Sequence, residues 1–92
     1  MSDQFHLKVQ ERAGIVYEGD VASITSYSEV GEFDVLPYHA NFISLIKNKL
    51  VIRETRGDPR EIAFNNALLR VSENKAEVYL GIEGVFSTES AA

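Results

Sequence analysis

The sequence has 92 residues, of which 45% are hydrophobic and 25% are charged, a size and composition typical of one soluble globular domain. Its 14 acidic and 9 basic side chains give a formal net charge of −5, which argues against binding to nucleic acid or anionic lipid. The absence of cysteine excludes disulfides, thiolate metal sites and cysteine nucleophiles. No apolar run is long enough to span a bilayer and the N-terminus lacks a signal-peptide layout, so we expect a cytoplasmic protein, with a peripheral place on a membrane complex left open.

Alternating apolar and polar residues predict β-strands through most of the chain. In the first strand, Phe5, Leu7 and Val9 share one face, while the residues between them are polar. The same period of two is typical of half-buried strands and recurs later in the chain. The further apolar stripes are Phe33 and Val35; Ile62 and Phe64; Ala67, Leu69 and Val71; and Ala76, Val78, Leu80 and Ile82.

Turn residues divide these strands at intervals of about ten residues, a spacing typical of a β-sandwich or barrel. Gly and Pro make residues 56–59 the clearest turn, because they supply the backbone conformations that turns need. We expect a hairpin loop at residues 72–75 and a bulge or short turn at Gly19-Asp20. The remaining breaks are Ala13-Gly14 and residues 28–31.

Two segments leave their local structure open. The apolar spacing in residues 39–50 fits one short helix, although we favour two strands divided near Lys47-Asn48. At Asn65-Asn66 the apolar set changes from even-numbered to odd-numbered positions. One extra residue reverses the face of every later side chain, so this change indicates a bulge or a bend between strands.

The sequence contains no recognisable constellation for catalysis or metal binding. His6 and His39 lie far apart and have no partner at a metal-ligand spacing; we expect His6 on a solvated strand face. His39 is expected to bond the backbone and fix the start of the next strand. There is no nucleophile elbow, no glycine-rich phosphate loop and no cluster of basic residues. We therefore predict no catalytic, cofactor or metal site, and a function carried by surfaces.

Residues 29–40 read E-V-G-E-F-D-V-L-P-Y-H-A and resemble the segment G-E-x-G-I/V-x-P-x-H-A of the epsilon subunit of F-type ATP synthases. The order of the flanking strands agrees over about residues 4–84. Asp34 stands where the family usually has Gly, Tyr38 replaces a small residue, and Asn65-Asn66 replaces Gly-Gly. The family's C-terminal helical hairpin does not follow, so the chain is either a naturally short form or part of a longer one; its N-terminus and polar tail favour the short form.

The resemblance implies a β-sandwich, that is, two sheets packed face to face, with about ten short strands. We expect the domain at residues 1–85 and a flexible polar tail at 86–92. The implied role is a non-catalytic rotor subunit that joins the gamma subunit to the membrane c-ring and couples rotation to ATP synthesis. The resemblance places it at the cytoplasmic face of the inner membrane, without membrane insertion, and as a monomer when isolated.

Two sets of contact residues follow as expectations. The resemblance directs the loop at residues 29–40 towards basic loops of the c-ring. The gamma subunit should instead cover apolar surface on one sheet. The c-ring candidates are Glu29, Glu32, Asp34 and His39, and the gamma candidates are Val51, Ile52, Phe64 and Tyr79. The alternatives are a free-standing β-sandwich adaptor with another partner and, less favoured, a small hydrolase.

Overall fold

The computed structural model describes residues 3–81, and these residues form strands joined by turns and loops. The strands begin and end close to the turn residues, because Gly, Asn and Pro interrupt the alternating apolar pattern. In chain order they are β1 (Phe5–Glu11), β2 (Gly14–Val21), β3 (Ser23–Ser28), β4 (Gly31–Val35), β5 (Phe42–Arg53), β6 (Arg60–Ser72) and β7 (Lys75–Leu80).

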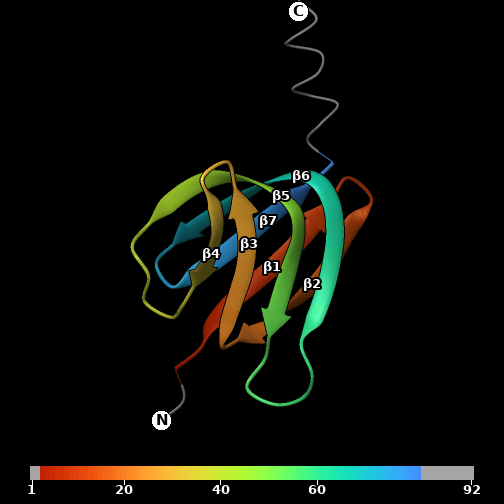
Figure 1. The fold of residues 1–92 in the computed structure, drawn as a ribbon. Helices are drawn as coiled ribbons and strands as arrows, with labels where there is room; N and C mark the ends of the chain where they lie inside the picture. The colour runs from red at the N-terminus through yellow and green to blue at the C-terminus, as the bar shows by residue number, and fades with distance from the viewer. Residues whose placement is uncertain (1–2, 82–92) are drawn as a thin grey trace, which may run out of the picture.

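The strands form one continuous hydrogen-bonded sheet in the order β2-β1-β7-β6-β5-β3-β4, in which only the β1–β7 pair is parallel. Figure 1 shows that β5 and β6 arch over the top of the molecule, so that one sheet folds into two facing layers. The first layer contains β2, β1, β7 and the adjoining halves of β6 and β5. The second contains the other halves of β6 and β5 together with β3 and β4. The expected β-sandwich is thus confirmed in architecture.

The bend depends on one extra residue in β6. Lys47 pairs with Asn66 and Asn48 pairs with Phe64, so Asn65 has no opposite residue and forms a β-bulge. This confirms the bulge predicted from the change of phase. The division of residues 39–50 into two strands is wrong, and so is the helical alternative, because β5 continues through this point. The described residues contain seven strands rather than about ten.

A second bulge lies in β2, at a different place from the one expected. Gly19-Asp20 neither turns nor bulges but pairs regularly with Leu7 and His6. The extra residue is Val16, because Val9 pairs with Tyr17 and Gln10 pairs with Ile15. Glycine suits position 19 for another reason, because a β-carbon there would lie only 3.3 Å from the Tyr17 hydroxyl oxygen.

The core lies between the two layers, and most of its residues belong to the alternating stripes identified in the sequence. Each layer contributes one face, because successive side chains of a strand point to opposite faces. Ser26 is the exception, and its hydroxyl donates to the Lys49 carbonyl oxygen at 2.8 Å, which satisfies a polar group that is only 1% exposed. The apolar core residues are Phe5, Leu7, Val9, Val21, Ile24, Val35, Ile46, Leu50, Ile52, Ala67, Leu69, Val71, Ala76 and Val78.

The expected hairpin loop at residues 72–75 is confirmed as a tight turn between β6 and β7, with Glu73 and Asn74 at positive φ. The expected domain end at residue 85, the tail at 86–92 and the inward Ile82 lie outside the described residues.

Candidate interaction surfaces

The acidic turn expected to meet a basic partner joins β3 to β4 and projects from one end of the second layer. Glu29 and Glu32 are exposed, and Val30 between them is 98% exposed. A hydrophobic side chain left almost wholly in water beside carboxylates is a suitable contact for a partner that combines apolar and basic groups. We name residues 28–32 the acidic turn.

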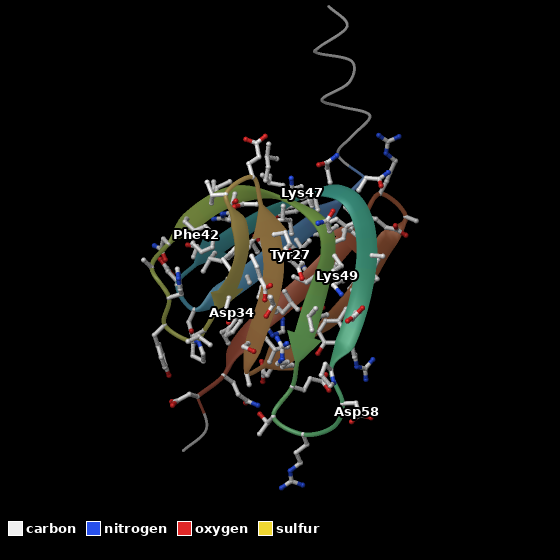
Figure 2. The ribbon with its side chains drawn as sticks, viewed as in Figure 1. Tyr27, Asp34, Phe42, Lys47, Lys49 and Asp58 are labelled. Atoms are coloured by element: carbon white, nitrogen blue, oxygen red, sulfur yellow. The ribbon has the colours of Figure 1, made fainter. Side chains whose placement is uncertain are left out.

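Asp34 is exposed but already has an internal partner. Its carboxylate accepts a hydrogen bond from the Thr25 hydroxyl at 2.6 Å, and the Thr25 oxygen accepts one from the Arg53 guanidinium at 2.7 Å. This relay ties β4, β3 and β5 together, and Figure 2 shows Asp34 on β4 beside β3. Asp34 therefore stabilises the layer that presents Glu32.

His39 lies in the β4–β5 loop and has the structural surroundings expected of it. Its Nδ1 lies 3.1 Å from the Ala40 carbonyl oxygen, its backbone N–H donates to Leu36, and its ring meets the edge of Phe42 at 5.2 Å between centroids. Phe42 in turn meets Phe33 at 6.2 Å, and both phenyl rings pack against the core. These contacts fix the start of β5.

The four residues expected to meet the gamma subunit differ in how much of each side chain is exposed. Ile52 is fully buried in the core and Val51 is only 7% exposed, so neither offers appreciable surface in this structure. Phe64 is half-buried against the core. Tyr79 is half-buried on the outer face of the first layer, where its hydroxyl donates to Glu77 at 3.0 Å. Burial, followed by the bond to Glu77, raises the pKa of Tyr79.

The structure also reveals an apolar surface that the sequence analysis missed. Across the outer face of the first layer, Leu45 pairs with Leu68, Leu68 with Tyr79, Tyr79 with Gln10, and Gln10 with Ile15. Directly paired residues point to the same face, so these side chains form a row across five strands. Leu45 and Ile15 are 55% and 56% exposed, and Ile43, on the same face of β5, is 66% exposed. We name Ile15, Ile43, Leu45, Leu68 and Tyr79 the apolar row.

A sequence signal for this row exists in β5. Residues 42–46 read F-I-S-L-I, in which apolar side chains fall on both faces of the strand rather than on one. Phe42 and Ile46 face the core, which leaves Ile43 and Leu45 in solvent. Adjacent apolar residues on the outer face of a strand whose inner face is already filled indicate a covering partner.

The acidic turn and the apolar row meet. Ser28, Glu29 and Val30 of the turn line a shallow hollow whose opposite wall is formed by Ile43 and Leu45, with Ser44 between them. One partner, or two adjacent partners, could therefore contact both surfaces without a polar gap between them.

Beside the apolar row, the outer face of the first layer carries two sets of paired charges. His6 lies between two carboxylates of β2, with Nε2 2.8 Å from Glu18 and Nδ1 3.2 Å from Asp20. The bonds to Glu18 and then Asp20 raise the pKa of His6 above 6.5, because only the protonated ring can donate from both nitrogens. On neighbouring strands, Arg70 pairs with Glu77 at 2.8 Å. These mutually neutralised side chains border the apolar row.

Residues 3–81 hold no group of three metal-ligating side chains, and no helix among them is long and apolar enough to cross a membrane.

Comparison with known proteins gives a consistent result. Residues 4–80 match the family described as ATP synthase, Delta/Epsilon chain, beta-sandwich domain. The chain is 36% identical to the ATP synthase epsilon chain of Nitratiruptor sp. over 97% of its own length and 73% of that relative's. It is 34% identical to the epsilon chain of Campylobacter curvus over 83% of its own length and 60% of that relative's.

A similar fold occurs in a chain of the Euglena gracilis mitochondrial ATP synthase, in a structure of the OSCP/F1/c-ring assembly. The TM-score is 0.79 at 15% identity, over 98% of this chain and 62% of that one. A chain of the Tetrahymena thermophila mitochondrial ATP synthase, from a structure of the central stalk and c-ring, gives a TM-score of 0.70 at 12% identity over 82% of this chain and 61% of that one.

Proposed function

This chain belongs to the ATP synthase delta/epsilon chain family, and we propose that it is a central-stalk subunit of a proton-translocating F-type ATP synthase. In this role it joins the gamma subunit to the c-ring and transmits rotation without bond chemistry of its own. It would then lie peripherally at the cytoplasmic face of the membrane.

The observation that carries the proposal is the continuity of the apolar row with the acidic turn. A rotor subunit must hold one partner firmly while it meets a ring of repeated subunits. The apolar row suits firm attachment, because burying apolar area is the main source of binding free energy. The acidic turn suits a ring that presents identical basic loops, since each ion pair at an interface rim contributes only about 0.2–1 kcal/mol.

The sandwich is suited to carrying torque between these contacts. Its two layers are joined through the continuous strands β5 and β6 rather than through flexible loops (Figure 1). At the open side of the sandwich, the Tyr17 hydroxyl of β2 donates to the Glu54 carboxylate at the end of β5, at 2.5 Å. The layers are thus fixed at two sides, which limits sliding of one layer over the other.

Leu45→Ser tests attachment to the gamma subunit. Burying a whole leucine side chain contributes about 1.5–3 kcal/mol, and Leu45 has 55% of its surface still to bury. The substitution should therefore weaken binding to purified gamma subunit by about five- to tenfold, with little dependence on salt. Unchanged affinity would contradict the assignment of the apolar row.

Glu32→Lys tests contact with the ring, and Asp58→Lys is its matched control. Both residues are exposed, but Asp58 lies in the β5–β6 loop at the opposite end of the molecule (Figure 2). Glu32→Lys should weaken docking to c-ring membranes, most strongly at low salt where exposed charges are least screened. Asp58→Lys should have a much smaller effect, and equal losses from the two variants would show that only net charge matters.

A further inference from the structure

Tyr38, in the β4–β5 loop, is both conformationally strained and solvent-exposed. Its φ of 63° lies in the left-handed region, which residues with a β-carbon rarely adopt, and its side chain is 72% exposed. Neither feature benefits the isolated domain, because burial of the large ring does not offset the strain. Strain of this kind persists only where the surroundings impose it, and it is concentrated at functional sites.

The surroundings that impose it come from the β6–β7 turn. The Tyr38 backbone N–H donates to the Asn74 side-chain oxygen at 2.7 Å, and the Asn74 amide nitrogen donates to the Gln4 carbonyl oxygen at 3.0 Å. A second bond joins the same two segments: the backbone N–H of Glu73, one residue before Asn74, donates to the side-chain oxygen of Asn41, three residues after Tyr38, at 3.0 Å. The loop is therefore clamped at two points to the turn, and through Asn74 to the N-terminal segment. In Figure 1 the β4–β5 loop and the β6–β7 turn lie on the same side of the molecule.

The base of the loop is fixed as well. The His39 ring contacts Phe42, which packs against the core, so the residues on the C-terminal side of Tyr38 have little freedom. Tyr38 is thus an exposed aromatic side chain on an immobilised backbone. A contact residue that is already held in its bound position loses less conformational entropy on binding, which favours affinity.

We propose that Tyr38 is a pre-positioned anchor that fills an apolar pocket of the gamma subunit, and that Asn74 is the positioning residue that presents it. The pocket would be apolar with a hydrogen-bond acceptor for the phenol at its base, the setting in which tyrosine dominates interface energies. We assign the gamma subunit rather than the c-ring because the exposed Tyr38 ring carries no charge to meet a basic loop, and because the next exposed large side chains along the chain, Ile43 and Leu45, belong to the apolar row. This inference rests on the proposed function.

Tyr38→Gly separates an anchor from a structural residue, because the two roles predict opposite changes. Glycine accepts the left-handed backbone without strain, so the melting temperature of the variant should stay the same or rise. Its affinity for the gamma subunit should nevertheless fall about 30-fold, as expected for an interface hot spot. A fall in both stability and affinity, or no change in affinity, would overturn the proposal.

Asn74→Gly tests the clamp, and Glu73→Gly is its matched control. Both residues have positive φ in the same turn, so glycine suits both, but only Asn74 holds Tyr38 through its side chain. Asn74→Gly should weaken binding in the wild-type background and have no further effect in the Tyr38→Gly background. Glu73→Gly should leave affinity unchanged. Additive effects of Tyr38→Gly and Asn74→Gly would contradict the positioning role.

Two further results separate this inference from its premise. If the wild-type chain does not bind the gamma subunit at all, the proposed function itself is wrong. If it binds, but Tyr38→Gly binds equally well, only the anchor is wrong. Lipid binding is tested by sedimentation with vesicles of phosphatidylcholine and phosphatidylglycerol. Binding to these vesicles that depends on Tyr38 would overturn the assignment to a protein partner.

Discussion

Deletion of Asn65 tests how one sheet becomes two layers. Asn65 is the single unpaired residue of β6, and it lies where β5 and β6 bend. Without it, Ile62, Phe64, Ala67, Leu69 and Val71 would alternate in one phase, so both halves of β6 would keep their inner side chains on the inner face. What the deletion removes is the bulge itself, and with it the local twist that bends the strand.

The structure sets the scale of the cost. If β6 straightens, the half-buried Ile62 and Phe64 lose their packing against the core, because they lie on the far side of the bend from Leu69 and Val71. Fully burying a side chain of this size contributes about 1.5–3 kcal/mol, so each loss should cost roughly half as much. Deletion should therefore destabilise the domain by about 1.5–3 kcal/mol, a sizeable part of the roughly 5–15 kcal/mol typical of a native protein.

Thermal unfolding followed by circular dichroism measures this loss. For a domain of this size 1 kcal/mol corresponds to about 4–8 °C, so the melting temperature should fall by about 6–24 °C. Asn65→Ser keeps the residue count and should change stability by less than about 0.5 kcal/mol. Deletion of Arg56, in the exposed β5–β6 loop, controls for shortening of the chain. A deletion of Asn65 that melts within a few degrees of these controls would refute the role given to the bulge.

Three further predictions concern side-chain contacts. His6→Gln should remove stability mainly at low pH: the folded-state pKa is raised, so the contribution of His6 is complete below pH 6.5 and is lost as pH rises through the folded pKa. Tyr17→Phe should cost about 1–2 kcal/mol in urea unfolding, because it leaves the Glu54 carboxylate without its donor. Burial and then the Glu54 bond raise the pKa of Tyr17 to about 12, so the same variant should lose a late-ionising tyrosine from the spectrophotometric titration of the wild type. Glu32→Lys should leave the melting temperature of the isolated domain nearly unchanged, because its side chain is exposed.

Each of these predictions has a contrary result. A stability difference between wild type and His6→Gln that grows with rising pH would show that His6 is not stabilised in its charged form. A neutral Tyr17→Phe would show that the Glu54 contact contributes nothing to closing the sandwich. Marked unfolding of Glu32→Lys would show that the acidic turn supports the fold itself.

The strands were predictable because their pattern is local. Phe5, Leu7 and Val9 alternate with polar residues whatever their partners are, and the bulge at Asn65 appears as a change of phase within one strand. The secondary structure of residues 39–50 was harder to predict, since a bent strand and two separate strands produce the same apolar pattern. The expectation for Gly19 failed because its neighbour in space, Tyr17, determines the need for glycine there.

The interaction surface was less predictable because it depends on pairing between distant strands. Leu45, Leu68 and Tyr79 lie in one row only because β5, β6 and β7 are neighbours in a particular register. The expected exposure of Ile52 is not found for the same reason: the opposite layer buries this residue, and the sequence of β5 alone does not reveal that layer. The clamp of Tyr38 by Asn74 joins residues 36 positions apart, and no local pattern reports it.

Site-directed cross-linking in assembled ATP synthase membranes tests the central claim most directly. The chain has no cysteine of its own, so Glu32→Cys and Leu45→Cys each introduce a single reactive thiol. The account predicts that the first variant cross-links to a cysteine placed in the polar loop of the c subunit, and that the second cross-links to the gamma subunit. A chain that assembles but cross-links from position 32 only to gamma, or from neither position to either subunit, would contradict the account.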